Sequence, residues 1–214
     1  MYTIDPRLPL PQVLDQYPSG APQRRNHVND YLLVPREMEH FNSLLARLGR
    51  TQPPLQTDQL ATAARNLNNA AGDESASPCI TQRMRHAHLL EQLLQETDWE
   101  PAAEVSCELH MVIAYLHASH QLIPDTVPGV GQLDQAIVID TVWPKLAGEV
   151  TNFLDYQRLR QQEAERQGRG YHDIAFNRRS WLELREIEAR LHEHQRRVRE
   201  GSYAPAPLSY FRVH

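Results

Sequence analysis

Residues 115–134 read YLHASHQLIPDTVPGVGQLD, and this stretch decides the fold. Its last eleven residues contain two prolines, two glycines and two aspartates. The segments before and after it both carry apolar residues at helical spacing. The stretch therefore predicts a sharp corner between two helices.

The prolines and glycines of the corner fix its backbone. Pro124 lacks an N–H donor and disfavours helical geometry at the residue before it, so the preceding helix should end near Gln121. Pro128 restricts the chain in the same way four residues later. Gly129 and Gly131 allow positive φ, which a tight reversal needs. We expect the corner to fold back onto the core, because most of its remaining residues are apolar.

The two aspartates of the corner are predicted to cap turns. Asp134 precedes an apolar run, so its carboxylate can accept an N–H from the first turn of the next helix. Asp125 can cap its own turn in the same way. A pair of carboxylates for acid–base chemistry is the alternative. The predicted structural motif consists of Pro124, Asp125, Pro128, Gly129, Gly131 and Asp134.

The pattern Leu122-Ile-Pro-Asp-x-x-Pro-x-x-Gly-x-Leu-Asp134, with the preceding Tyr115 and Ser119, resembles the signature of the YkvA-like small helical domains, a family of unknown function. The signature spans residues 115–135, and the resemblance extends over 105–142. It implies a helical hairpin that occurs mostly in bacteria, often near membranes, with no established activity. The chain departs from the family pattern in three places: proline is common where His120 stands, and aspartate where Gln121 and Gln135 stand.

Helical spacing continues on both sides of the corner, and no segment shows strand alternation of useful length. A long fifth helix should run from Asp134 to Gly168, with a kink at Pro144. Ser180 and Glu183 form a capping box for a last helix. The sequence therefore predicts an all-α fold of about six helices, an irregular helical bundle with a C-terminal helical hairpin. The expected parts are a Pro-rich N-terminal arm (1–30), a helical core (34–160), the hairpin extension (161–200) and a tail (201–214).

Composition narrows the class of protein. The formal net charge of −5 gives no general reason to expect nucleic acid as a partner, and the arginines of the last helices are mixed with acidic residues. Two cysteines cannot form a disulfide framework, and Cys107 is predicted to be buried. The N-terminus has no signal-peptide pattern, and no apolar stretch is long enough to span a bilayer. We therefore expect a cytoplasmic protein. The resemblance implies that it is bacterial, and any membrane contact that it implies would be peripheral.

Histidines near the corner suggest a metal site. His117 and His120 are three residues apart, which places them on one face of a helix, and His110 lies two turns earlier. With Asp125 or Asp134 folding over them, His117 and His120 would give a two-histidine, one-carboxylate site for a divalent transition metal. The alternative is that these histidines lie at the edge of a helix and hydrogen-bond to the backbone or to water, with no cofactor. Glu37-x-x-His40 resembles half of a di-iron motif, but no second copy exists, so a solvated helix face is expected.

Two functions follow from these patterns. The first is a non-catalytic interaction or scaffold protein that binds a protein partner or itself through its C-terminal helices. The fifth helix motivates it, because about 50 Å of helix exceeds the width of a small domain. The second is a metal-dependent hydrolase that uses His117, His120 and Asp125. No nucleophile elbow or phosphate-binding glycine loop supports other catalysis.

Overall fold

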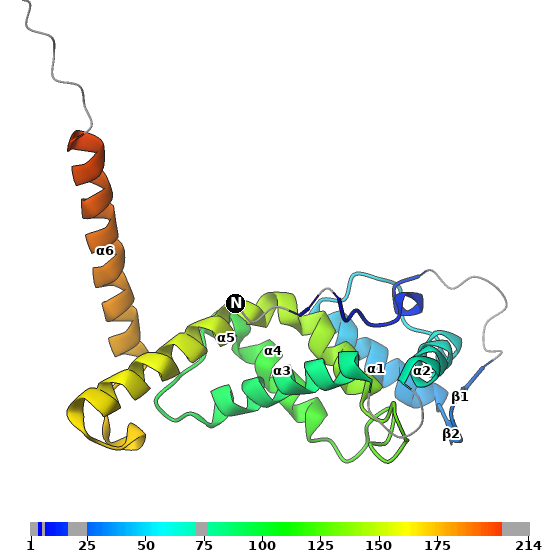
Figure 1. The fold of residues 1–214 in the computed structure, drawn as a ribbon. Coiled ribbons are helices and arrows are strands. Elements are labelled where there is room, and N and C mark those ends of the chain that lie inside the picture. The colour runs from blue at the N-terminus through cyan, green and yellow to red at the C-terminus, as the bar shows by residue number, and fades with distance from the viewer. Residues whose placement is uncertain (1–3, 6, 17–24, 72–76, 203–214) are drawn as a thin grey trace, which may run out of the picture. The chain divides into compact units, whose positions relative to one another are not determined.

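The chain is built almost entirely from helices, as predicted (Figure 1). The computed structural model describes residues 4–5, 7–16, 25–71 and 77–202. The α-helices are α1 (Pro35–Leu48), α2 (Thr57–Ala71), α3 (Pro78–Gln95), α4 (Ala103–Leu116), α5 (Leu133–Gln167) and α6 (Arg178–Ser202). Short 3-10 helices are η1 (Gln12–Leu14) and η2 (Tyr171–Asp173), and strand β1 (His27–Val28) pairs antiparallel with β2 (Tyr31–Leu32).

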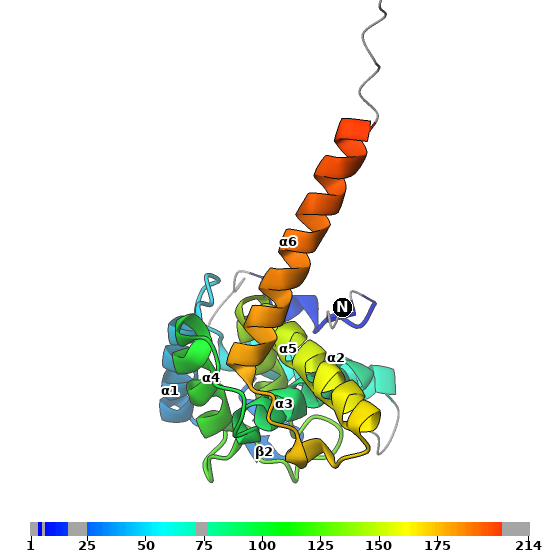
Figure 2. The same ribbon diagram turned by 90° about the vertical axis from the view of Figure 1, so that its left-hand side faces the viewer.

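The chain divides into two compact units, residues 1–155 and 156–214. The first unit holds α1 to α4 and most of α5. The second holds the last turns of α5, η2 and α6, which is one uninterrupted helix (Figure 2). The predicted tail lies outside the described residues from 203 onward. None of the described helices has an apolar stretch long enough to cross a membrane.

The first half of α5 is the most deeply buried helical segment of the first unit. Four consecutive residues, 136–139, are at most 2% exposed. A helix that is apolar on every side must be surrounded by protein, so α5 is central to this core. Each fully buried aliphatic or aromatic side chain contributes about 1.5–3 kcal/mol to stability. Pro144 lies inside α5, and Gly168, in the left-handed region with a φ of 63°, follows its end.

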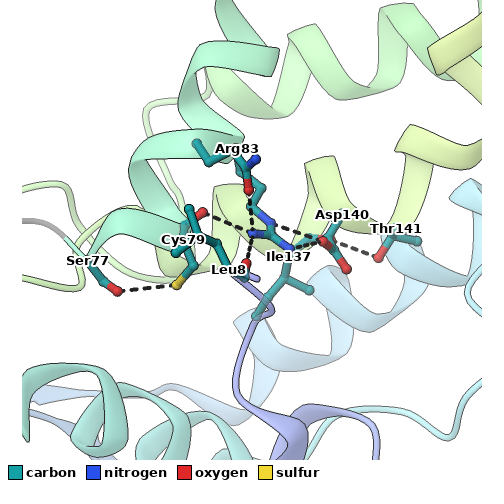
Figure 3. A network of polar contacts seen from close by, with 8 residues as sticks. Leu8, Ser77, Cys79, Arg83, Ile137, Asp140 and Thr141 are labelled. Atoms are coloured by element: carbon teal, nitrogen blue, oxygen red, sulfur yellow. Dashed lines mark hydrogen bonds and ion pairs between the residues drawn. The ribbon is translucent and has the colours of Figure 1, made fainter. Parts of the chain in front are cut away.

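Buried polar side chains hold the described part of the N-terminal arm against the first unit. The guanidinium of Arg83, 2% exposed, donates to Asp140 at 3.0 and 2.6 Å and to the carbonyl of Leu8 at 2.5 Å (Figure 3). Arg50 donates to the carbonyl of Leu14, and Gln59 donates to two further carbonyls of the arm. Residues 7–16 are therefore packed on the body rather than extended from it.

Three predictions about this unit are wrong. Helix α4 ends at Leu116 rather than near Gln121, because the Gln121 side chain donates to the Leu116 carbonyl at 2.9 Å and satisfies the helix end. Gly129 has a positive φ of 75°, but Gly131 does not. Gly131 is instead required by close packing, since a Cβ there would lie 2.5 Å from the carbonyl oxygen of Asp125. Cys107 is exposed, because it lies on the outer face of α4.

In the second unit, Arg160 organises the loop between α5 and α6. Its side chain is 1% exposed and donates to the carbonyls of Tyr171 and Ile174 and to the hydroxyl of Tyr156. The predicted capping box at Ser180 is wrong, because α6 begins two residues earlier. The side chain of Asn177 accepts the Ser180 N–H at 3.0 Å and caps the helix instead.

Candidate functional site

The corner between α4 and α5 is built around a buried carboxylate. Asp134 is completely shielded from solvent. Its Oδ2 accepts a 2.5 Å hydrogen bond from the Tyr115 hydroxyl and a 3.2 Å bond from the Ile123 N–H. The Tyr115 hydroxyl in turn accepts the Leu122 N–H at 3.3 Å. One carboxylate and one phenol thus join α4, the corner loop and α5.

Burial controls the ionisation of this pair. Loss of water raises the pKa of Asp134 to about 6, although the hydrogen bonds from Tyr115 and Ile123 act in the opposite direction. Its Oδ1 has no hydrogen-bond partner among the described residues, so the charge is only partly compensated. Burial, together with the nearby Asp134 charge, also raises the pKa of Tyr115. Asp134 therefore gains or loses its proton close to neutral pH.

The predicted capping roles of the two aspartates differ from the observed ones. Helix α5 begins at Leu133, and the Ala136 N–H already bonds to the Gln132 carbonyl, so Asp134 lies inside the first turn. Its carboxylate bonds to other segments rather than acting as the N-cap. Asp125 accepts a 2.9 Å hydrogen bond from Gln135, which also donates to Gln121 at 2.9 Å. Gln121 and Gln135 stand where the YkvA-like pattern has aspartate, and here they bond to each other.

A polar hollow of about 410 Å³ opens beside the corner. Its two carboxylates are Glu37 and Asp125, and no arginine or lysine is among the ten residues that line it. The Tyr31 hydroxyl lies 3.5 Å from Glu37, and burial and this carboxylate raise the pKa of Tyr31. The hollow is lined by Tyr31, Glu37, Leu116, His117, Ala118, Ser119, His120, Gln121, Pro124 and Asp125.

The hollow contains the three residues of the predicted metal site, but they do not form one. Because α4 ends at Leu116, His117 and His120 are not on one helix face. His117 is exposed, and its Nε2 lies 3.2 Å from the Oε1 of Glu91. His110 bonds to its own helix, at the Ser106 carbonyl. Across the described residues, no three histidine, cysteine or acidic side chains lie close enough together to hold a metal ion.

The sequence did not predict which residues outside the corner motif line the hollow or contact His117. Glu37, expected on a solvated helix face, lines the hollow and is half-buried. Tyr31 and Glu91 carried no sequence signal, because each lies more than 20 residues from the corner and only the tertiary fold brings them to it.

A second candidate surface lies on α6. Six large apolar side chains are clearly exposed in the part of the chain that the structure describes, and four of them belong to this helix. Ile187 and Leu191 are 62% and 54% exposed. The four are Leu182, Ile187, Leu191 and Val198.

Comparison of the chain with family models, with curated proteins and with solved structures gave no significant match, so the likeness of the corner motif to the YkvA-like family stays a prediction.

Proposed function

We propose that this chain is a non-catalytic helical interaction protein that associates with a second copy of itself through α6. The observation that carries the proposal is the concentration of exposed apolar side chains on this one helix. Exposed apolar groups scattered singly are ordinary, but a contiguous set on one element marks an interaction surface.

Two of these exposed residues, Ile187 and Leu191, make a narrow stripe with the half-buried Leu184. Leu184, Ile187 and Leu191 follow each other at intervals of three and four, which keeps them on one side of a helix. We call these three residues the α6 stripe. The same spacing forms the contact seam between paired helices.

Ion pairs along the polar faces stabilise α6 independently of the stripe. Arg190 bonds to Glu186 at 2.5 Å, and Arg197 bonds to Glu193 at 2.9 Å, each one turn apart. Such pairs contribute about 0.3–0.5 kcal/mol each to a helix. Burying the stripe against a partner releases its apolar surface from water, at about 25 cal/mol per Å².

Multi-angle light scattering across a concentration series tests the proposal. The wild-type protein should show a mass above that of one chain at tens of micromolar. The double variant Ile187→Ser/Leu191→Ser should remain monomeric. Leu182→Ser is the matched control, because Leu182 is also about half-exposed but lies nine residues from Leu191, which is half a turn around the helix.

Two results would contradict the proposal. The first is a wild-type protein that stays monomeric over the whole series. The second is equal loss of association in the Leu182 control and the stripe variant, because the stripe would then have no special role.

A further inference from the structure

The two units carry opposite charge. Residues 1–155 contain 10 lysines and arginines against 19 acidic residues, a formal charge of −9. Residues 156–214 contain 12 arginines against 8 acidic residues, a formal charge of +4. Contact between unlike units of two copies is therefore attractive, whereas contact between like units is repulsive.

Half of this basic excess lies on α6, the helix that carries the stripe. This helix contains seven arginines and five glutamates. Glu193 is shared by two arginines, Arg196 at 2.7 Å and Arg197 at 2.9 Å. Two α6 helices placed against each other would bring these excess arginines together. An acidic surface is the better partner, because the planar guanidinium matches a carboxylate.

The first unit has exposed apolar side chains close in sequence to residues of its acidic hollow. Among the described residues, the two exposed large apolar side chains that are not on α6 are Leu32 and Val34, at 47% and 38%. They are neighbours in sequence of Tyr31 and Glu37, which line the hollow at the corner. Glu37 and Asp125 make this hollow negative, and the lining residue His117 is already paired with Glu91. Apolar and acidic residues thus lie close together in the sequence here, as apolar and basic residues do on α6.

We propose that α6 of one copy docks on the corner hollow of a second copy, with the α6 stripe against Leu32 and Val34 and α6 arginines toward Glu37 and Asp125. This inference rests on the proposed self-association through α6 and names the surface that receives it. The two contacting surfaces are different, so the interface is head to tail. Repeated contacts of this kind build rings or open chains, and two copies that each place α6 on the hollow of the other form the smallest ring.

Mixing two defective variants tests this geometry. The tail variant Ile187→Ser/Leu191→Ser keeps the hollow, and the head variant Leu32→Ser/Glu37→Gln keeps α6. Each alone should be monomeric at a concentration where the wild type associates. An equimolar mixture should give a species of two chains and no larger, because only one working interface remains. Thermal melts of both variants check that they are folded.

A charge control and a salt series complete the experiment. Glu39→Gln removes a charge from the same helix at a residue that does not line the hollow, and it should associate like the wild type. Raising the salt concentration from about 0.05 M to about 0.5 M should weaken wild-type association several-fold, since exposed charges are screened.

The outcomes separate this inference from the proposed function. If the stripe variant is monomeric but the head variant associates like the wild type, the hollow is not the receiving surface and the inference is overturned, while α6 remains the binding element. If the head variant is monomeric but mixing restores no complex, one contact between α6 and the hollow does not hold two copies together, and the inference is again overturned. A wild-type protein that never associates overturns both.

Discussion

The hydroxyl of Tyr115 donates a 2.5 Å hydrogen bond to the carboxylate of Asp134, nineteen residues further along the chain. Asp134 is fully buried, and its second oxygen has no hydrogen-bond partner in the part of the chain that the structure describes. Because the same carboxylate oxygen accepts the Ile123 N–H, one side chain ties the first half of the corner loop to the start of α5. The protonation state of Asp134 should therefore affect the stability of the whole first unit.

The first prediction concerns Asp134→Asn and pH. The folded protein holds the Asp134 proton with a pKa of about 6, above the value of 3.8 for a free carboxyl, so it binds the proton more tightly than the unfolded chain does. The free energy of unfolding of the wild type, relative to that of Asp134→Asn, should rise as the pH falls from 7 to 4. This extra stability should be lost as the pH rises through 6. The full change is about 3 kcal/mol.

Urea unfolding of both proteins at several pH values measures this difference, because titrations common to the two proteins cancel. A difference in unfolding free energy that does not vary between pH 4 and pH 7 would show that Asp134 titrates normally and that its burial has no electrostatic cost.

The second prediction concerns Tyr115→Phe. Phenylalanine keeps the ring beside Phe41 but removes the hydroxyl that donates to Asp134 and accepts the Leu122 N–H. At pH 7 we expect a loss of about 1.5–3 kcal/mol, because a buried carboxylate loses a donor. Tyr31→Phe is the control: its hydroxyl bond to Glu37 is 3.5 Å long and partly exposed, so it should cost less than about 0.5 kcal/mol. Equal losses in urea unfolding would contradict this account.

The corner motif predicted that the chain reverses here, but it did not predict which contacts the side chains of the motif make. Proline and glycine act through their own backbone, so the positions of Pro124 and Gly129 carry that information locally. Asp134 looked like a helix cap because it precedes an apolar run. Its actual partners, Tyr115 and Ile123, are known only once α4 and the loop have folded against α5.

The structure gave no support to the metal hypothesis, for a related reason. It assumed that the helix before the corner continued through His117 and His120. The side chain of Gln121 instead bonds to the Leu116 carbonyl and ends α4 earlier. A side-chain cap of this kind depends on one rotamer, which apolar spacing does not reveal.

The third prediction compares two glycines. Gly131→Ala should destabilise the protein by roughly 1–3 kcal/mol, because the new Cβ would lie 2.5 Å and 2.9 Å from the carbonyl oxygens of Asp125 and Pro124. Gly148→Ala is the matched control in the exposed middle of α5, where no atom lies within 4 Å of the new Cβ. It should stabilise the protein by about 0.5–1 kcal/mol. Thermal melts show whether each variant is more or less stable than the wild type. A stabilised Gly131→Ala protein would refute the close packing of the corner.

The last prediction concerns the attachment of the N-terminal arm by Arg83. Arg83→Lys replaces a planar fork by a single ammonium group, which cannot reach Asp140 and the Leu8 carbonyl with the same geometry. The arm should open more often, so the Leu14 amide, which bonds to the Pro11 carbonyl, should exchange its hydrogen faster. Arg85→Lys, two residues away on the exposed face of α3, should leave that exchange rate unchanged. Hydrogen exchange measures both variants, and an unchanged rate in Arg83→Lys would show that Arg50 and Gln59 alone hold residues 7–16 in place.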